Sequence, residues 1–339
     1  MLAERLTAQL LAGEPARTPE AVAERLLAIQ AQDARGARLA VRARTSGLTA
    51  ADVDRALGER SLVITTLNRG TLHLVRSEDY PWLRALTGPT LETTALSRLA
   101  GEGYAPDAAG RALAHTERTL ADEGPLTRAV LRERLAAAGF ATEGQRVPHL
   151  LFLAAIRGLV VRGPVAGREQ ALVLARDWLG EPPPVDRDAA LAELARRYLK
   201  GHGPASDRDL ARWAGLPLRD ARAGLAAIAS RLAERPDGLV DLRKRPPAAP
   251  LPPPRLLGAF EPLLLGWASR EPVVGEHEGR LVAGGIFRAF ALVRGRAVAT
   301  WAVRDGAGPE LHEPFVPVAR THLRALERER ADVARFLSA

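Results

Sequence analysis

Residues 200–232 read KGHGPASDRDLARWAGLPLRDARAGLAAIASRL, and this segment decides the fold of the 339-residue chain. Ser206 and Asp209 have the spacing of a capping pair at the start of a helix. Gly215 and Pro217 then interrupt the chain before a second helix. Two helices joined by a short turn that contains glycine form a helix-turn-helix, a unit with which many proteins bind DNA.

An internal repeat indicates that this unit occurs more than once. The motif Gly-Pro-x-Thr begins at Gly124, and Gly-Pro-x-Ser begins at Gly203, 79 residues later. Leu131 matches Leu210 at the same offset. In the earlier copy, Thr127 is the predicted cap of a helix. A fixed offset of this kind indicates that one structural unit has been used at least twice.

Helices and hairpins follow one another in the same order in each copy. In the copy with Thr127, a second helix and then a hairpin within 158–175 are predicted. In an N-terminal copy, Thr18, Asp33 and Thr49 are the predicted caps of three helices. ITTLNRGTLHLV, over 64–75, then predicts two short strands around a turn. Helix, helix, helix, hairpin is the order of a winged helix.

The chain is therefore predicted to be mainly α with small β, with three tandem winged-helix units and a C-terminal β-rich domain. RKRPPAAPLPPPR predicts an extended linker because proline cannot continue a helix. After it, strands are predicted within 256–267 and 286–303, and a closing helix over 319–337. The predicted domains are winged helix 1 (1–85), winged helix 2 (86–185), winged helix 3 (186–242), the linker (243–255) and the β-rich domain (256–339).

The basic residues are almost all arginine. The formal net charge is +8, and 46 of the 48 basic residues are arginine, since Lys200 and Lys244 are the only lysines. Arginine pairs bidentately with phosphate and with guanine, which favours a nucleic-acid partner. The alternative explanation is a bias in base composition, which enriches alanine, glycine, proline and arginine together and requires no binding function. The charge alone therefore does not locate a binding face.

Several classes of protein are excluded or disfavoured by what the sequence lacks. With no cysteine, the chain has no disulfide, thiolate zinc site, iron-sulfur cluster or cysteine nucleophile. It has no phosphate-binding GxxxxGK[ST], HExxH, GxSxG or dinucleotide GxGxxG motif. The seven histidines lack metal-ligand spacing, so we expect neither a metal nor a cofactor. Without a membrane-spanning run or a signal peptide, we expect a monomer in the cytoplasm, associated with the nucleoid.

Gln30-Ala31-Gln32 is the candidate catalytic motif, because it lies between the end of one predicted helix and the cap of the next. In an extended chain, side chains two apart share a side, so both amides would point to one place. Arg35, Arg38 and Arg42 follow with helical spacing and are candidate DNA-binding residues. The alternative is that the glutamines cap helix ends and the arginines form a solvated face.

Four further residues are candidates for contact with DNA. Arg69 and His73 lie in the RGTLH segment of the first hairpin, although a turn arginine and a strand histidine also have ordinary structural uses. Arg219 and Arg222 lie in the second helix of the segment 200–232. A second helix of this kind is the one that usually enters the major groove.

AIQAQDARGARLAVRART, LNRGTLHLVRSEDYPWL, YLKGHGPASDRDLARWAGLP, LLGAFEPLLLGWASR and LVRGRAVATWAV occur in this order. Together they resemble the winged-helix family of AlkZ-type DNA glycosylases over nearly the whole chain. The resemblance implies a concave DNA-binding body of three winged helices with a C-terminal β domain. It also implies catalysis by the Gln-x-Gln motif, here Gln30 and Gln32. This chain departs from the family at Gly258, Glu261 and Ala299, where proline, aspartate and glycine are usual.

The resemblance implies a monofunctional DNA glycosylase that acts on double-stranded DNA carrying alkylated purines. Members excise bulky N7-alkylpurines or unhook interstrand crosslinks, and Gln30 and Gln32 would position the water. Lys200 and Lys244 lie far in sequence from the glutamines, so we expect no Schiff base and an abasic product. The alternative function is a winged-helix transcriptional regulator without catalysis, which tandem DNA-binding units would support by themselves.

Overall fold

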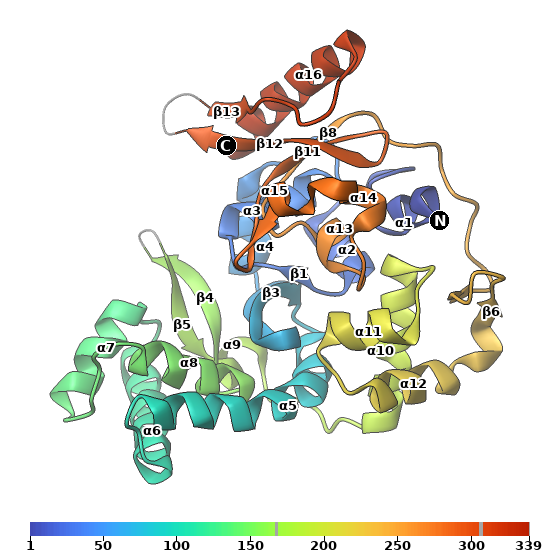
Figure 1. Ribbon diagram of the computed structural model, residues 1–339. Helices are drawn as coiled ribbons and strands as arrows, with labels where there is room; N and C mark the ends of the chain where they lie inside the picture. Colours follow the sequence, from blue (N-terminus) through green and yellow to red (C-terminus); the bar gives the residue numbers. More distant parts are fainter. Residues whose placement is uncertain (167–168, 305–307, 339) are drawn as a thin grey trace.

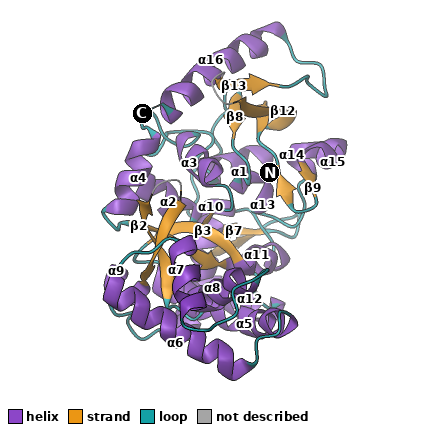
Figure 2. Ribbon diagram, turned by 90° about the vertical axis from the view of Figure 1, so that its left-hand side faces the viewer, coloured by secondary structure: helices purple, strands orange, loops and turns teal. Residues whose placement is uncertain are grey.

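The computed structural model describes residues 1–166, 169–304 and 308–338, and it is mainly α-helical with small sheets, as the sequence predicts. Figure 1 shows β1 and β3 near the centre, with residues 106–174 on one side, residues 187–242 on the other and the C-terminal region above. Figure 2 shows α16 at one end of the molecule and α5 and α6 at the other. Among the described residues, no helix is long and apolar enough to cross a membrane.

The first unit contains the three predicted helices and the hairpin in the predicted order, after an additional N-terminal helix. The Thr18 hydroxyl accepts a hydrogen bond from the Ala21 N–H at 3.1 Å, and Asp33 caps the next helix through the Gly36 N–H. Thr49 begins the third helix with a capping box. The elements are α1 (Leu2–Ala8), α2 (Pro19–Leu26), β1 (Ile29–Gln30), α3 (Ala34–Arg42), α4 (Ala50–Gly58), β2 (Leu62–Leu67), η1 (Asn68–Gly70) and β3 (Thr71–Arg76).

α5 (Tyr80–Gly101), a 22-residue helix that was not predicted from the sequence, spans the predicted boundary between residues 85 and 86, and the remaining elements of the second unit follow it. The Thr127 hydroxyl accepts from the Val130 N–H at 3.3 Å, as predicted for a helix cap. Leu131 and Leu135 are fully buried on the inner face of that helix. The elements are α6 (Pro106–Glu123), α7 (Arg128–Ala137), α8 (Arg146–Ile156), β4 (Val160–Ala166), β5 (Glu169–Leu174) and α9 (Ala175–Leu179).

The third unit contains the predicted helix-turn-helix. Ser206 and Asp209 form the predicted capping box, and Gly215 ends that helix in the left-handed conformation with φ of 70°. The elements are α10 (Arg187–His202), α11 (Asp207–Ala214), α12 (Leu218–Ala227), η2 (Ala229–Arg231), β6 (Leu232–Glu234) and β7 (Val240–Leu242).

Backbone pairing repeats at the offset that the sequence predicts. Leu126 bridges Leu172 in the hairpin of the second unit, and Ala205 bridges Val240 in the hairpin of the third. These two bridging residues are 79 positions apart and each directly precedes a helix cap. The internal repeat in the sequence is therefore a repeat of structure.

The first two hairpins join in one antiparallel sheet with strand order β1-β3-β2-β4-β5. Ile64 on β2 pairs with Arg162 on β4, so β2 has a neighbour on both sides. The sheet therefore connects the first unit to the second through backbone hydrogen bonds as well as through side-chain packing.

The C-terminal region differs in part from its prediction. Arg294 and Gly295 have φ of 51° and 80° and form the predicted turn between β11 and β12. The prediction of a strand along 256–267 is wrong beyond Leu257. Pro262 has no backbone N–H to donate to a neighbouring strand, and it begins a helical turn that Glu261 caps. The elements are β8 (Arg255–Leu257), α13 (Pro262–Leu265), α14 (Glu271–Val274), η3 (Gly275–His277), α15 (Glu278–Leu281), β9 (Val282–Ala283), β10 (Ile286–Phe287), β11 (Phe290–Val293), β12 (Arg296–Arg304), β13 (Gly308–Leu311) and α16 (Arg320–Leu337).

The C-terminal region shares its core with the first unit. Residues of α2, α3 and α4 pack in one apolar cluster with β11, β12 and α16. A buried ion pair crosses the same interface: Arg44 and Glu261 are both 0% exposed, and their closest atoms are 2.5 Å apart. Residues 243–254 contain no helix or strand, as predicted for a linker. The described apolar residues after it nevertheless pack in clusters that they share with earlier parts of the chain.

Two buried histidines predict how stability depends on pH. Burial lowers the pKa of both His73 and His202 to about 3, from an ordinary value of about 6.5. In the unfolded chain both groups take up a proton as pH falls below that ordinary value, whereas in the fold they stay neutral. Their contribution is therefore complete above about pH 6.5 and decreases as pH falls toward 3.

We expect the free energy of unfolding to fall by about 2 kcal/mol for each of these histidines between about pH 7.5 and pH 5. Urea titrations across this range measure it. His202→Phe keeps an aromatic ring between Tyr198 and Trp267, and it should remove about half of the pH dependence. A stability that stays constant down to pH 5 would contradict the burial of these two rings as neutral groups.

Candidate active site and nucleic-acid interface

The glutamine segment is an extended edge of the five-stranded sheet. Gln30 pairs with His73 across β1 and β3, and the Ala31 N–H donates to the Leu72 carbonyl at 2.7 Å. The extended connection between two helices that the sequence predicts is therefore present. The strand ends at Gln30, and the chain then bends toward the Asp33 cap.

Gln30 is held by Arg69. Gln30 is only 6% exposed, and its amide oxygen accepts from an Arg69 guanidinium nitrogen at 3.2 Å. Arg69 also donates to the Trp213 carbonyl, at the end of α11 in the third unit. Burial, and then the charges of Arg212 and Arg270, lower the pKa of Arg69 to about 10, so it stays charged near neutral pH. The first and third units therefore meet at the arginine that orients this amide.

Gly215 allows the third unit to approach the turn of the first hairpin closely. It has a positive φ, and a Cβ at this position would lie 2.8 Å from the Arg69 backbone nitrogen. Only glycine meets both requirements without strain. The turn of the helix-turn-helix therefore packs directly against the turn of the first hairpin.

Gln32 is exposed and contacts the backbone of the neighbouring strand. Its amide oxygen accepts from the Leu72 N–H at 3.3 Å. The Leu72 carbonyl accepts from the Ala31 N–H, and the Leu72 N–H donates to the Gln32 side chain. The Gln32 amide oxygen therefore takes the place of a backbone carbonyl beside β3. Each glutamine amide oxygen therefore has one protein donor, and each retains a second lone pair.

The two glutamines line different hollows on the two sides of residues 68–72. Gln30 lines a hollow of about 200 Å³ with Arg212, Trp267 and Arg270. Gln32 lines one of about 180 Å³ with Arg128 and Arg162, among others. The expectation that both amides point to one place is not met here, because the extended geometry ends at Gln30.

His73 lies in a row of polar side chains across the sheet. Thr65, His73 and Gln30 are direct neighbours on β2, β3 and β1, and directly paired residues project from the same face. His73 Nδ1 lies 2.9 Å from the Thr71 carbonyl, so Nδ1 carries the proton and Nε2 keeps a lone pair. His73 is only 2% exposed, so the predicted DNA contact at this residue is wrong.

The three arginines of α3 have separate surroundings. Arg35 is exposed and makes no ion pair in the part of the chain that the structure describes. Arg38 pairs with Asp54 and donates to the Ala34 carbonyl at 2.9 Å. Both remain candidates for DNA contact.

Arg42 is buried between α3 and the C-terminal helix. It is 4% exposed and pairs with Glu329 at 2.5 Å and with Asp332 at 3.0 Å, both on α16. Its predicted contact with phosphate is wrong, because the same face of α3 that looks basic in sequence packs against the C-terminal helix. Arg42 instead fixes α16 to the first unit.

The two candidate arginines of α12 remain exposed. Arg219 on α12 is one of the most exposed side chains of this helix, and Arg222 pairs with Asp207 at 2.7 Å. A surface ion pair of this kind stabilises little, so Arg222 can exchange its carboxylate for a phosphate at small cost. Both remain predicted DNA-binding residues.

Sequence reasoning missed the arginines that border the glutamine hollows. Arg212 and Arg270 lie beside Gln30, and Arg128 and Arg162 lie beside Gln32. Burial, and then the charge of Arg128, lower the pKa of Arg162, as expected where like charges gather. These residues come from distant segments, and no spacing along the chain carries a signal for them.

Neither lysine lines the glutamine hollows. Lys200 pairs with Glu24 at 2.7 Å, and Lys244 follows β7. The described residues contain no cluster of three or more histidine or acidic side chains that could hold a metal ion. The groups available for chemistry at this site are therefore amides, arginines and threonine hydroxyls.

The chain is similar to known proteins along nearly its whole length. The family model described as "DNA glycosylase AlkZ-like" matches residues 23–336. An interstrand DNA cross-link repair glycosylase from Streptomyces sahachiroi is 30% identical, over 99% of this chain and 95% of that protein. The solved structure of Streptomyces sahachiroi DNA glycosylase AlkZ superposes with a TM-score of 0.82 at 27% identity, covering 99% of this chain and 95% of that one.

Proposed function

This chain belongs to the AlkZ-like family of DNA glycosylases, and from that premise we propose that it is a monofunctional enzyme for bulky N7-alkylpurines or interstrand crosslinks in double-stranded DNA. The observation that carries the proposal is the pair of glutamine amides beside β3, each bordered by arginines. The relative from Streptomyces sahachiroi, named for interstrand cross-link repair, supports the crosslink as one substrate. The enzyme acts as a nucleoid-associated monomer.

The positive charge of the lesion allows neutral side chains to catalyse hydrolysis of the glycosidic bond. An N7-alkylated guanine is cationic, which weakens its glycosidic bond, so the enzyme needs to stabilise an oxocarbenium-like sugar and to place a water at C1′. Gln30 acts from one hollow and Gln32 from the other: the free lone pair of each amide oxygen accepts from the attacking water, and the amide NH2 groups donate to the sugar oxygens. Arg69 and the Leu72 N–H hold the two oxygens in place. Pre-oriented polar groups of this kind stabilise charge that develops in the transition state.

The product is an abasic site with an intact backbone. A glycosylase that also cuts the strand uses an amine as a nucleophile. Lys200 is engaged by Glu24, and neither lysine lines the glutamine hollows. Water is therefore the nucleophile, and a strand break appears only after alkali treatment.

A duplex with one N7-alkylguanine tests this function directly. The protein is incubated with end-labelled DNA, and half of each sample is heated in alkali before electrophoresis. We expect strand breaks at the lesion in the alkali-treated half only, and in excess of the breaks that the heat- and alkali-labile lesion gives in an identical sample without protein. Binding of the duplex without any break would support the alternative, a DNA-binding regulator without catalysis.

Arg35→Ala should weaken DNA binding equally for all sequences and lower the slope of log affinity against log salt by about one unit. Arg35 is exposed, so its contact with a phosphate would add one released counterion. Arg38→Ala should have a smaller effect, since Arg38 must first leave Asp54. Fluorescence anisotropy over a range of salt concentrations measures both slopes.

Arg111→Ala is the matched control, because Arg111 is an exposed arginine on α6, in another unit. Its salt slope should equal that of the unaltered protein. Equal slopes for Arg35→Ala and Arg111→Ala would remove α3 from the proposed DNA interface.

A further inference from the structure

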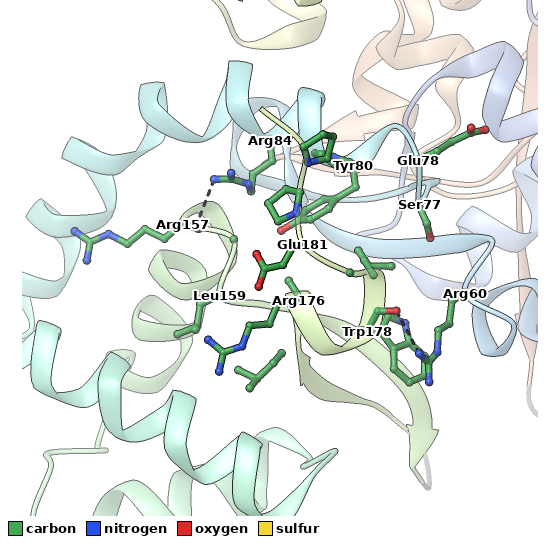
Figure 3. Close-up of a pocket in the computed structure, with 18 residues that line it drawn as sticks. Arg60, Ser77, Glu78, Tyr80, Arg84, Arg157, Leu159, Arg176, Trp178 and Glu181 are labelled. Carbon is green, nitrogen blue, oxygen red and sulfur yellow. Dashed lines mark hydrogen bonds between the residues drawn. The ribbon is translucent and has the colours of Figure 1, made fainter. Parts of the chain in front are cut away.

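A further cavity lies at the junction of the first two units, away from the glutamines. Its volume is about 710 Å³, within the range of sites that take small organic ligands. It opens at the start of α5 on one side and at α9 with the following residues 180–183 on the other. None of its lining residues borders either glutamine hollow. Figure 3 shows the side chains that surround it.

Three polar atoms of its wall are buried without a hydrogen-bond partner among the described residues. They are the Tyr80 hydroxyl, the Ser77 hydroxyl and the Trp178 indole nitrogen. Tyr80 is only 4% exposed, and Figure 3 shows its hydroxyl pointing into the cavity toward Glu181. Buried polar groups are almost always paired, so three in one wall indicate a missing partner that offers oxygen acceptors. Burial raises the pKa of Tyr80 to about 12, so its hydroxyl remains a donor.

The charge beside these atoms is positive and incompletely neutralised. Arg84 is one helical turn from Tyr80 on α5, so the two side chains share a face. Its guanidinium donates to the Arg157 carbonyl at 3.4 Å and has no ion pair in residues 1–166, 169–304 or 308–338. Arg157 is neutralised by Glu92 at 2.5 Å. Arg60 and Glu181 also line the cavity without an ion pair among the described residues, so these three charges leave a net charge of +1, and Arg84 is the unpaired cation that shares a helix face with Tyr80.

The part of the lining around Trp178 offers a planar surface. Arg60 stacks over the Trp178 ring at 4.2 Å, which fixes the indole at the edge of the cavity. Pro81, Pro182 and Pro183 add apolar surface. The cavity thus combines apolar walls with a small number of polar groups, as is typical of sites for small organic molecules.

We propose that this cavity binds a small organic anion, with its acidic group on Tyr80 and Arg84 and its ring system between the prolines and Trp178. This goes beyond DNA repair, since the site shares no residue with the glutamine hollows. Residues 60–84 come from the first unit and its connection, whereas residues 157–183 come from the second. The bound molecule therefore bridges the two units and stabilises their junction.

The probe is 8-anilinonaphthalene-1-sulfonate, a sulfonate with a naphthalene and a phenyl ring that fluoresces when it leaves water. We expect one saturable site per chain and a higher melting temperature when it is occupied. N-phenyl-1-naphthylamine has the same rings without the sulfonate and should bind at least about tenfold more weakly, as expected from the loss of a charge-assisted hydrogen bond.

Tyr80→Phe and Arg84→Gln should each weaken the sulfonate probe by about tenfold or more, because each removes one donor to its oxygens. Tyr104→Phe and Arg111→Gln are the matched controls, since the Tyr104 hydroxyl already donates to the Ala141 carbonyl and Arg111 lies on α6. The controls should bind as the unaltered protein does. Melting temperatures without probe verify that all variants are folded.

Trp178→Phe is a second test if Tyr80→Phe is unstable, since it keeps an aromatic ring and removes the indole donor together with part of the planar surface. It should weaken the probe as well. The proposal is overturned if the unaltered protein shows no saturable site, if the neutral probe binds as well as the sulfonate, or if the folded cavity variants bind like the controls.

Discussion

Replacing Gln30 or Gln32 with alanine is expected to reduce base excision by about 10²-fold or more, the effect of losing a positioned catalytic group. Each amide oxygen is held by one protein donor, Arg69 or the Leu72 N–H, and has one lone pair left for a water. Alanine removes this acceptor but leaves the backbone of β1. Single-turnover excision of an N7-alkylguanine duplex measures the effect, and DNA affinity should barely change.

Gln145→Ala is the matched control, because Gln145 is an exposed glutamine at the start of α8 in the second unit. If both amides hold one water, the double variant should be little slower than the slower single variant. Excision rates that multiply would instead mean that the two hollows hold different groups of the substrate. Single variants with full activity, or with activity that falls only as much as their stability, would leave the glutamines with a structural role alone.

Glu261→Ala is expected to lower the free energy of unfolding by about 3–5 kcal/mol, a large fraction of the total for most proteins. Glu261 and Arg44 are both fully buried, so the variant leaves a guanidinium charge without its carboxylate. Arg44 keeps its bonds to Gln9 and to the Ala40 carbonyl, but these carry no opposite charge. Urea titration followed by circular dichroism measures the change.

Glu327→Ala is the control for this pair. Glu327 pairs with Arg330 at 2.8 Å on the exposed face of α16, where an ion pair contributes less than about 1 kcal/mol. A loss of less than 1 kcal/mol in Glu261→Ala as well would mean that the cavity left behind admits water to Arg44.

Features of the fold that depend on neighbouring residues could be predicted from the sequence. Thr18, Asp33, Thr127 and Ser206 cap helices as predicted, because a cap is formed by the residue and an N–H three positions later. The extended connection at Gln30 is predictable for the same reason: two helices end and begin close to it.

Features that depend on distant segments could not be predicted. Arg42 has the helical spacing of a DNA-binding residue, yet Glu329, almost three hundred residues later, buries it. The arginines around the glutamines are likewise brought together only by tertiary packing, as Arg128 and Arg162 show. Charge and spacing identify which side chains can bind an anion. Only the packing shows which of them lack a carboxylate partner and therefore remain able to bind an anion.

The pairing of β2 with both β3 and β4 has a consequence for shortened forms of this protein. A chain cut after the first hairpin would lose the pairing of Ile64 with Arg162 on β4 and the packing of the second hairpin, and would expose one edge of LVITTL. An exposed apolar edge is a template for intermolecular strand addition. We therefore expect the first unit alone to aggregate more readily than the whole chain, in which the second hairpin lies against this edge.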